Sequence, residues 1–269
     1  MLDLLFWPFM AALVVGGMHV YLGMHVVTRG VIFVDLALAQ MAAVGATVGF
    51  LLGMEPEGIP AYLTALSFTL LGAWMFTVLR DKRGQIPQEA IIGITYVVGA
   101  AVMILLLSKA PDGGEHINNL LVGSILFVSP KIVGYTFLLY LVIGGIFYRF
   151  REPITAASDS YHKGGNRDTQ RKWNFLFYAL FGFVVTSAVQ IVGILLVFSY
   201  LIVPAVGAML YVQTWRSRLI FGWIMSLTVS MLGILASIWL DLPTGAAIVA
   251  TFGLMLIVLA VARGFIQRA

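Results

Sequence analysis

Residues 25–49 read HVVTRGVIFVDLALAQMAAVGATVG and place Asp35 and Gln40 inside a run that is apolar enough to cross a membrane. The whole chain of 269 residues has the same character, since 61% of it is hydrophobic and only 10% is charged. Soluble domains are about 45–50% apolar and about 25% charged. The sequence therefore predicts an all-α integral membrane protein, with one transmembrane domain over residues 1–269.

Turn and charge signals divide the chain into segments of about 20 mostly apolar residues, the length that crosses a bilayer as a helix. Eight or nine spans are expected. The weakest division lies at Gln190, because 174–212 has no charged interruption and could instead hold one span and a broken segment. Residues 117–130 are too short to cross, and they predict a short re-entrant or interfacial helix that Pro130 ends. The expected spans are 4–27, 31–53, 59–79, 90–108, 132–149, 174–190, 191–212, 219–240 and 243–263.

Basic residues indicate the orientation of these spans. If the loops after the first, third, fifth and seventh spans and the C-terminus are cytoplasmic, they hold every Lys and Arg except Lys109 and Lys131. Such a bias is typical of the cytoplasmic side of membrane proteins, so the net charge of +4 indicates topology rather than nucleic-acid binding. The longest loop, 150–172, is then expected to be a solvated cytoplasmic connection.

The opposite face is acidic and carries Asp112 and Glu115 with His116 beside them. These three residues are candidates for a transient metal contact or for a docking loop on the outer face. The alternative is that acids simply occupy the side that basic residues avoid. Because the chain has no cysteine, any metal must bind to His, carboxylate, amide or backbone oxygen.

Ionisable residues inside a span usually face the bundle interior or a water-filled path. Asp35 shares one helical stripe with Ala39, Ala42, Ala46, Gly49 and Gly53, and small residues mark places where membrane helices approach each other. His19 belongs to a similar stripe with Ala12, Gly16 and Gly23. Both side chains are therefore predicted to point into protein rather than lipid.

Depth along the helices suggests two polar tiers. At a rise of about 1.5 Å per residue from Arg29, His19 and Gln40 lie roughly 15 Å inside, and His25 and Asp35 roughly 6–9 Å. Asp35 and Gln40 point about 140° apart around their helix, so they need not share a site. One hypothesis is that these four residues line a cation path. The alternative is that Asp35 pairs with Arg29 or His25 and that the others bond between helices.

Several enzyme motifs are missing from the sequence. It has neither a G-x-x-x-x-G-K-[ST] nucleotide loop nor an H-E-x-x-H zinc motif, and no paired carboxylates suggest phosphotransfer. We therefore expect a transport protein without its own ATPase or other enzymatic activity.

Three stretches together resemble the permease subunits of metal-type ABC importers, which carry zinc, manganese or iron. They are HVVTRGVIFVDLALAQMAAVGATVGFLLG at 25–53, QEAIIGITYVVGAAVMILLLSKAPDGGEHINNLLVGSILFVS at 88–129 and VGILLVFSYLIVPAVGAML at 192–210. The resemblance implies a multi-pass protein of a bacterial or archaeal plasma membrane. It also implies three partners: a second permease copy, a cytoplasmic ATPase that binds ATP, and an extracytoplasmic metal-binding protein.

The resemblance also implies roles for particular residues. The segment PAVGAMLYVQTWRSR at 204–218 resembles the coupling helix that contacts the ATPase, with Pro204 at its start and Gln213, Trp215, Arg216 and Arg218 as contact residues. Asp35 resembles the acidic residue of a motif in which metal importers often carry a histidine one turn later. Here that turn holds Ala39 and Gln40, which weakens the case for zinc and leaves room for a harder, oxygen-preferring ion or another substrate, and His19 is a candidate replacement.

The predicted function is therefore that of the permease subunit of an ATP-driven importer for a divalent metal ion. Zinc and manganese are the first candidates for this ion. Two alternatives remain open. One keeps the architecture and changes the substrate to a metal chelate or another small solute. The other is an ion-coupled secondary carrier in which Asp35 binds a proton or sodium.

Overall fold

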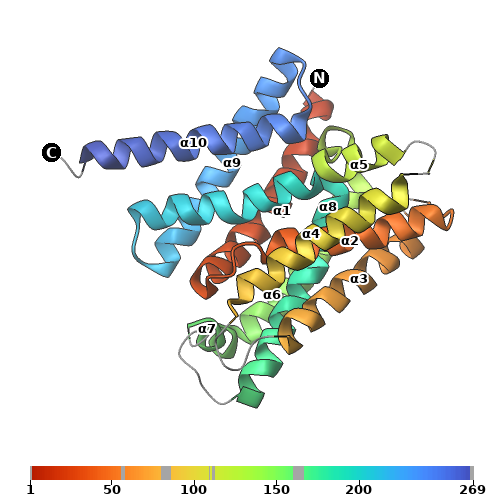
Figure 1. Cartoon of the computed structure of the whole chain (residues 1–269). Coiled ribbons are helices and arrows are strands. Elements are labelled where there is room, and N and C mark those ends of the chain that lie inside the picture. Colours follow the sequence, from red (N-terminus) through yellow and green to blue (C-terminus); the bar gives the residue numbers. More distant parts are fainter. Residues whose placement is uncertain are drawn as a thin grey trace.

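The computed structural model describes residues 2–55, 58–79, 86–108, 110, 113–159 and 167–266, and these residues form helices without a strand (Figure 1). Eight of the helices are long and apolar enough to cross a membrane, namely α1, α2, α3, α4, α6, α8, α9 and α10. The predicted all-α membrane fold is thus confirmed. The helices are α1 (Leu2–Arg29), α2 (Val34–Leu51), α3 (Ile59–Val78), α4 (Gln88–Leu107), α5 (Gly113–Val122), α6 (Pro130–Arg149), α7 (Arg151–Asp159), α8 (Arg167–Tyr211), α9 (Trp215–Leu240) and α10 (Thr244–Ile266), with a 3-10 turn, η1 (Ile125–Phe127).

The α8 helix joins the two spans that the sequence separates at Gln190. Its helical geometry fails at Gly193, where φ is +76° and ψ is 165°. In Figure 1 the helix changes direction at this break, and its second half runs across the bundle toward α9. The broken-segment alternative is therefore the correct one, with the break three residues after Gln190. Glycine is needed there because other residues rarely adopt a positive φ.

The break in α8 lies directly against the backbone at the end of α5. A methyl group on Gly193 would overlap the backbone of Gly123 and Val122, and one on Gly123, where φ is +70°, would overlap the backbone of Val192. The Ser124 N–H donates to the Ile191 carbonyl oxygen at 3.3 Å. The break is thus held by direct backbone contact with the segment between α5 and η1.

Two short helical elements differ in part from what the sequence predicts. The short helix expected over 117–130 is present as α5 followed by η1, and Pro130 begins α6 rather than ending α5, with Ser129 as its N-cap. The expected solvated connection at 150–172 is wrong over residues 151–159, which form α7, and over residues 167–172, which begin α8. The α7 helix forms because Ile154 and Ala157 recur on one face and are buried against the bundle. Residues 160–166 lie outside the described part.

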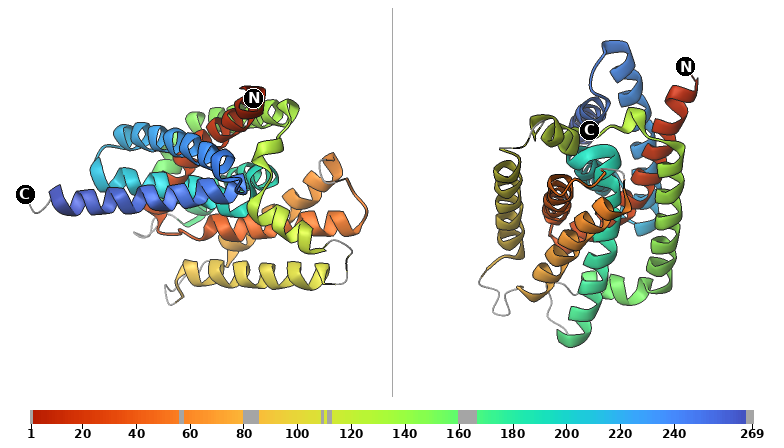
Figure 2. Two further views of the ribbon diagram at one scale, coloured as in Figure 1. Left: turned by 90° about the horizontal axis from the view of Figure 1, so that it is seen from above. Right: turned by 90° about the vertical axis from the view of Figure 1, so that its right-hand side faces the viewer.

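The helices pack in two groups that share α8. The α2 helix packs chiefly on α3 and α4 as well as α8, whereas α1 packs chiefly on α8 and α9. Figure 2 shows α4 at the edge of the bundle in both views. The predicted small-residue stripes mark these contacts, since Gly23 of α1 meets the backbone of Leu201 and Gly49 of α2 faces Thr64 and Ala61. Gly53 lies beyond the end of α2 and does not belong to its contact face.

Candidate functional site

Asp35 lies in the first turn of α2 and is fully buried. Neither of its carboxylate oxygens accepts a hydrogen bond from the described residues. Buried polar atoms are nearly always hydrogen-bonded, and an unpaired buried carboxylate destabilises a fold. Such a group is therefore expected to serve a purpose other than stability, and binding a cation or a proton is the purpose that suits a carboxylate.

Tyr140 of α6 lies beside His19. The centroids of the two rings are 6.4 Å apart. The Tyr140 hydroxyl donates to the Val184 carbonyl oxygen at 3.0 Å and accepts from Ser187 Oγ at 3.2 Å. Three helices, α1, α6 and α8, thus each contribute one polar side chain to a buried cluster of His19, Tyr140 and Ser187.

His19 has one ring nitrogen committed and one available. Its Nδ1 lies 2.8 Å from the Val15 carbonyl oxygen, while its Nε2 is buried and has no hydrogen-bond partner among the described residues. An N–H at Nδ1 donates to that carbonyl and leaves the lone pair on Nε2. This is the arrangement found in metal-binding histidines, whose second nitrogen is oriented by a backbone carbonyl or a carboxylate.

A cavity of about 610 Å³ lies between α2, α3, α5, α6 and α8 at the end of the bundle predicted to face outward. Ser187 belongs to both the cavity lining and the buried cluster, so the cavity borders that cluster. The hydroxyl of Tyr62 and Nε2 of His116 are buried in its lining without a partner in the described ranges. The lining also includes Phe50, Asn119, Tyr135, Thr136 and Gln190, and none of its residues is an acid, Lys or Arg.

His116 is the one residue of the predicted outer-face contact that the structure brings to this cavity. Its ring stacks on Phe50 with centroids 4.4 Å apart, and burial lowers the pKa of the imidazole, so the ring is uncharged at pH 7. Glu115 is exposed, and Asp112 lies outside the described residues. Across the described ranges, no group of three His, Asp or Glu side chains gathers to hold a metal.

The two predicted polar tiers are not formed. Gln40 Nε2 lies 3.7 Å from Met103 Sδ on the α4 side, away from Asp35, as the 140° separation predicts. His25 Nδ1 lies 3.2 Å from Ser158 Oγ of α7 rather than beside Asp35. Equal depth does not bring these side chains together because α1 and α2 pack against different neighbours.

Arg29 is fully buried at the end of α1 and ties this helix to α7 and α8. Its Nε donates to Ser158 Oγ at 2.9 Å and its Nη1 donates to Asn174 Oδ1 at 3.0 Å. Its guanidinium carbon lies 3.8 Å from the ring centroid of Phe177. The alternative in which Asp35 pairs with Arg29 or His25 is therefore wrong, because both basic side chains turn toward Ser158 and leave the carboxylate of Asp35 without a hydrogen bond.

Arg29→Lys is expected to lower the free energy of unfolding by about 2 kcal/mol, since an ammonium cannot reproduce two divergent hydrogen bonds and stacking on Phe177. Thermal unfolding of the purified protein in detergent measures the effect. The matched control is Arg263→Lys in the last turn of α10, which should leave the melting temperature unchanged. Equal melting temperatures of the two variants would contradict a structural role for Arg29.

The comparison with protein families decides what kind of protein carries this site. The model of the ABC 3 transport family matches residues 1–263. The chain belongs to the ABC 3 transport family. It is thus a multi-pass membrane permease of an ABC transporter, which confirms the resemblance seen in the sequence.

Relatives and a solved structure agree with this membership. The chain is 26% identical to the manganese import system permease protein ScaB of Streptococcus gordonii, over 92% of this chain and 87% of that protein. It is 24% identical to a probable iron transport system membrane protein of Haemophilus influenzae, over 96% of this chain and 93% of that protein. PsaBC from Streptococcus pneumoniae shares the fold, with a TM-score of 0.77 and 23% identity over 95% of this chain and 90% of that one.

The segment of this ABC 3 permease expected to be a separate coupling helix is built differently. Pro204 lies inside α8 instead of starting a helix, α8 continues to Tyr211, and α9 begins at Trp215 after a short turn. Gln213 is exposed on this turn, and Arg216 is exposed in the first turn of α9. The segment 204–218 is therefore the end of one long helix and the start of another, with a turn between them.

The turn is connected to the Arg29 contacts. Arg218 Nε donates to the Val212 carbonyl oxygen at 3.0 Å and closes the turn. The Trp215 ring lies 4.9 Å from the ring of His25, which contacts the same Ser158 hydroxyl as Arg29. A displacement of the turn would therefore disturb the contacts of His25 and Ser158, at the ends of α1 and α7.

Proposed function

We propose that this ABC 3 permease imports a divalent metal ion and that Asp35 contacts the ion during its passage. The observation that carries the proposal is the carboxylate of Asp35, which is fully buried and accepts no hydrogen bond from the described residues. The relatives named for manganese and iron transport support the choice of substrate class. Asp35 was singled out from the sequence, whereas Tyr140 and Ser187 were not.

The proposed path begins in the cavity near Tyr62 and His116 and continues past Ser187 and Tyr140 to Asp35. Carboxylate and phenol oxygens with one imidazole favour manganese or ferrous iron, and zinc less, since zinc prefers sites richer in imidazole and thiolate. So few protein ligands also suit an ion that is passed onward rather than retained.

The volume of the cavity supports a second candidate substrate. About 610 Å³ is within the range of pockets that hold small organic ligands, and the lining carries no acid, Lys or Arg. A metal that arrives with a small neutral chelator would fit this space. The ion would then leave its chelator at Asp35 or cross with it.

The energy for import is proposed to come from partners. A cytoplasmic ATPase would bind ATP and press on the turn around Gln213, Trp215 and Arg216, while a second permease copy would complete the path. An extracytoplasmic metal-binding protein would deliver the substrate. Motion of the turn would reach α1 and α7 through Trp215, His25 and the hydroxyl of Ser158.

Uptake by proteoliposomes tests the proposal. The permease is reconstituted with its co-purified ATPase and binding protein, and accumulation of manganese, iron and zinc is measured with and without ATP on the nucleotide-accessible side. ATP-dependent accumulation of one metal is the expected result and names the substrate. Accumulation driven by an ion gradient without ATP would indicate a secondary carrier. ATPase activity stimulated by the binding protein without movement of any free metal would point to a chelate or another solute.

A further inference from the structure

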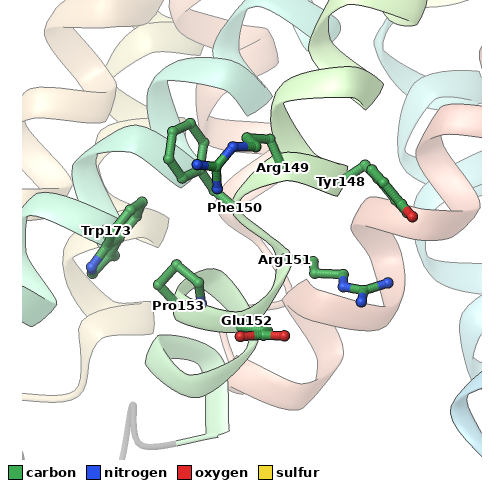
Figure 3. Close-up of a pocket in the computed structure, with 7 residues that line it drawn as sticks. All are labelled: Tyr148, Arg149, Phe150, Arg151, Glu152, Pro153 and Trp173. Carbon is green, nitrogen blue, oxygen red and sulfur yellow. The ribbon is translucent and has the colours of Figure 1, made fainter.

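A second cavity, of about 490 Å³, lies at the basic end of the bundle, where α6 ends and α7 begins (Figure 3). Neither the proposed metal path nor the contact with the ATPase uses it. It surrounds the turn between the two helices and is closed on the α8 side by Trp173. Its lining residues are Tyr148, Arg149, Phe150, Arg151, Glu152, Pro153 and Trp173.

Two exposed arginines dominate the charge of this cavity. The guanidinium carbon of Arg149 lies 5.4 Å from the ring centroid of Phe150, and that of Arg151 lies 5.2 Å from that of Tyr148. Aromatic rings orient a guanidinium without neutralising it, so both groups remain able to bind an anion. Glu152 is the one acid in the lining, and the exposed Arg171 and Lys172 directly precede Trp173, so the surroundings are positive.

The depth of the cavity indicates where an anion would come from. Arg149 is the last residue of the membrane-spanning α6, and Arg171 and Lys172 directly precede the apolar run of α8 that begins at Trp173. The cavity therefore lies at the level where the hydrocarbon core gives way to lipid headgroups. Tyr148 and Trp173 agree with this position, since both residue types are enriched at membrane interfaces.

One exposed face of α6 leads to the same place. Gly134, Leu138, Leu141, Gly145 and Tyr148 recur on one face of the helix, and all five are exposed. Open space surrounds both glycines at the positions where a side chain would begin. The two glycines alternate with larger apolar residues, which suits a flexible acyl chain, and this face ends at Tyr148, the ring beside the guanidinium of Arg151.

We propose that this cavity binds the phosphate headgroup of an anionic phospholipid whose acyl chain lies along the exposed face of α6. Guanidinium groups bind phosphate oxygens in pairs of hydrogen bonds, and basic pockets between membrane helices on the cytoplasmic side bind such headgroups. A second copy of this chain is a poorer occupant, because packing two α6 faces about a twofold axis would bring the arginines of both copies toward each other.

Native mass spectrometry of the whole transporter, released from vesicles of phosphatidylglycerol and phosphatidylcholine, tests the proposal. The wild type is expected to retain phosphatidylglycerol in preference to phosphatidylcholine. The double variant Arg149→Gln/Arg151→Gln removes two exposed charges. It should therefore retain at least about tenfold less phosphatidylglycerol than the wild type. The matched control is Lys131→Gln/Arg263→Gln, which removes two charges elsewhere at the membrane boundary and should behave as the wild type.

Four results would overturn the proposal. Equal retention of phosphatidylglycerol by the double variant would exclude the arginines, and equal retention of both lipids by the wild type would exclude headgroup recognition. Displacement of the lipid by millimolar inorganic phosphate would indicate a site for the free anion. A photo-crosslinker at position 148 that labels the ATPase or a second permease, rather than lipid, would assign this face to a protein contact.

Discussion

Asp35→Asn is expected to reduce ATP-dependent metal accumulation by about 100-fold or more, while the protein folds as well as the wild type. The amide keeps the shape of the side chain and removes its charge. Loss of residues that merely orient metal ligands already costs about 10–100-fold, so loss of a group that contacts the ion should cost at least as much. Because the carboxylate is buried without a hydrogen bond, the free energy of unfolding should stay the same or rise.

Metal uptake and ATPase stimulation, measured on the same proteoliposomes, separate this effect from a folding defect. Asp35→Asn should still assemble with the ATPase and respond to the binding protein. Asp241→Asn is the matched control, since Asp241 is exposed at the end of α9 with a φ of +52°, a conformation that asparagine also tolerates. Normal uptake by Asp35→Asn would show that this residue does not contact the ion. Only the proposed permease architecture would then stand.

Gly193→Ala is expected to lower the free energy of unfolding by about 3 kcal/mol or more and the melting temperature by about 5–10 °C. Alanine at a φ of +76° costs about 1–2 kcal/mol. The added methyl group would also overlap the backbone of Gly123 and Val122, which cannot move as a flexible side chain can. Gly123→Ala should have a similar effect, because its own methyl group would overlap the backbone of Val192 across the same contact.

The control for this prediction is another glycine within a membrane helix. Gly253 of α10 has open space around the position of a methyl group, so Gly253→Ala should leave the melting temperature unchanged or raise it slightly. Thermal unfolding in one detergent compares the variants directly. If Gly193→Ala and Gly253→Ala melt alike, the break in α8 is not held by the backbone contacts described above.

The sequence was most informative where a feature is contained within one helix. The inward direction of Asp35 and His19 follows from small residues on the same helical face, and both side chains are fully buried. The sequence also indicates the break in α8, because the weakest of the predicted divisions between spans, at Gln190, lies three residues before Gly193. The helical periodicity of residues 151–159 was present in the sequence, but their polarity obscured it, and α7 was expected to be loop.

By itself, the sequence determined that the chain is a helical membrane permease, approximately where it crosses, and which side chains turn inward. Only the tertiary structure decided that Ser187 and Tyr140 connect the outer cavity with His19, and that Arg29 and His25 meet at Ser158 instead of pairing with Asp35. The physical reason is that hydrophobic periodicity records which face of a helix is buried but not which helix covers it. In a membrane protein every span is apolar, so the choice of neighbours depends on close packing between helices distant in sequence.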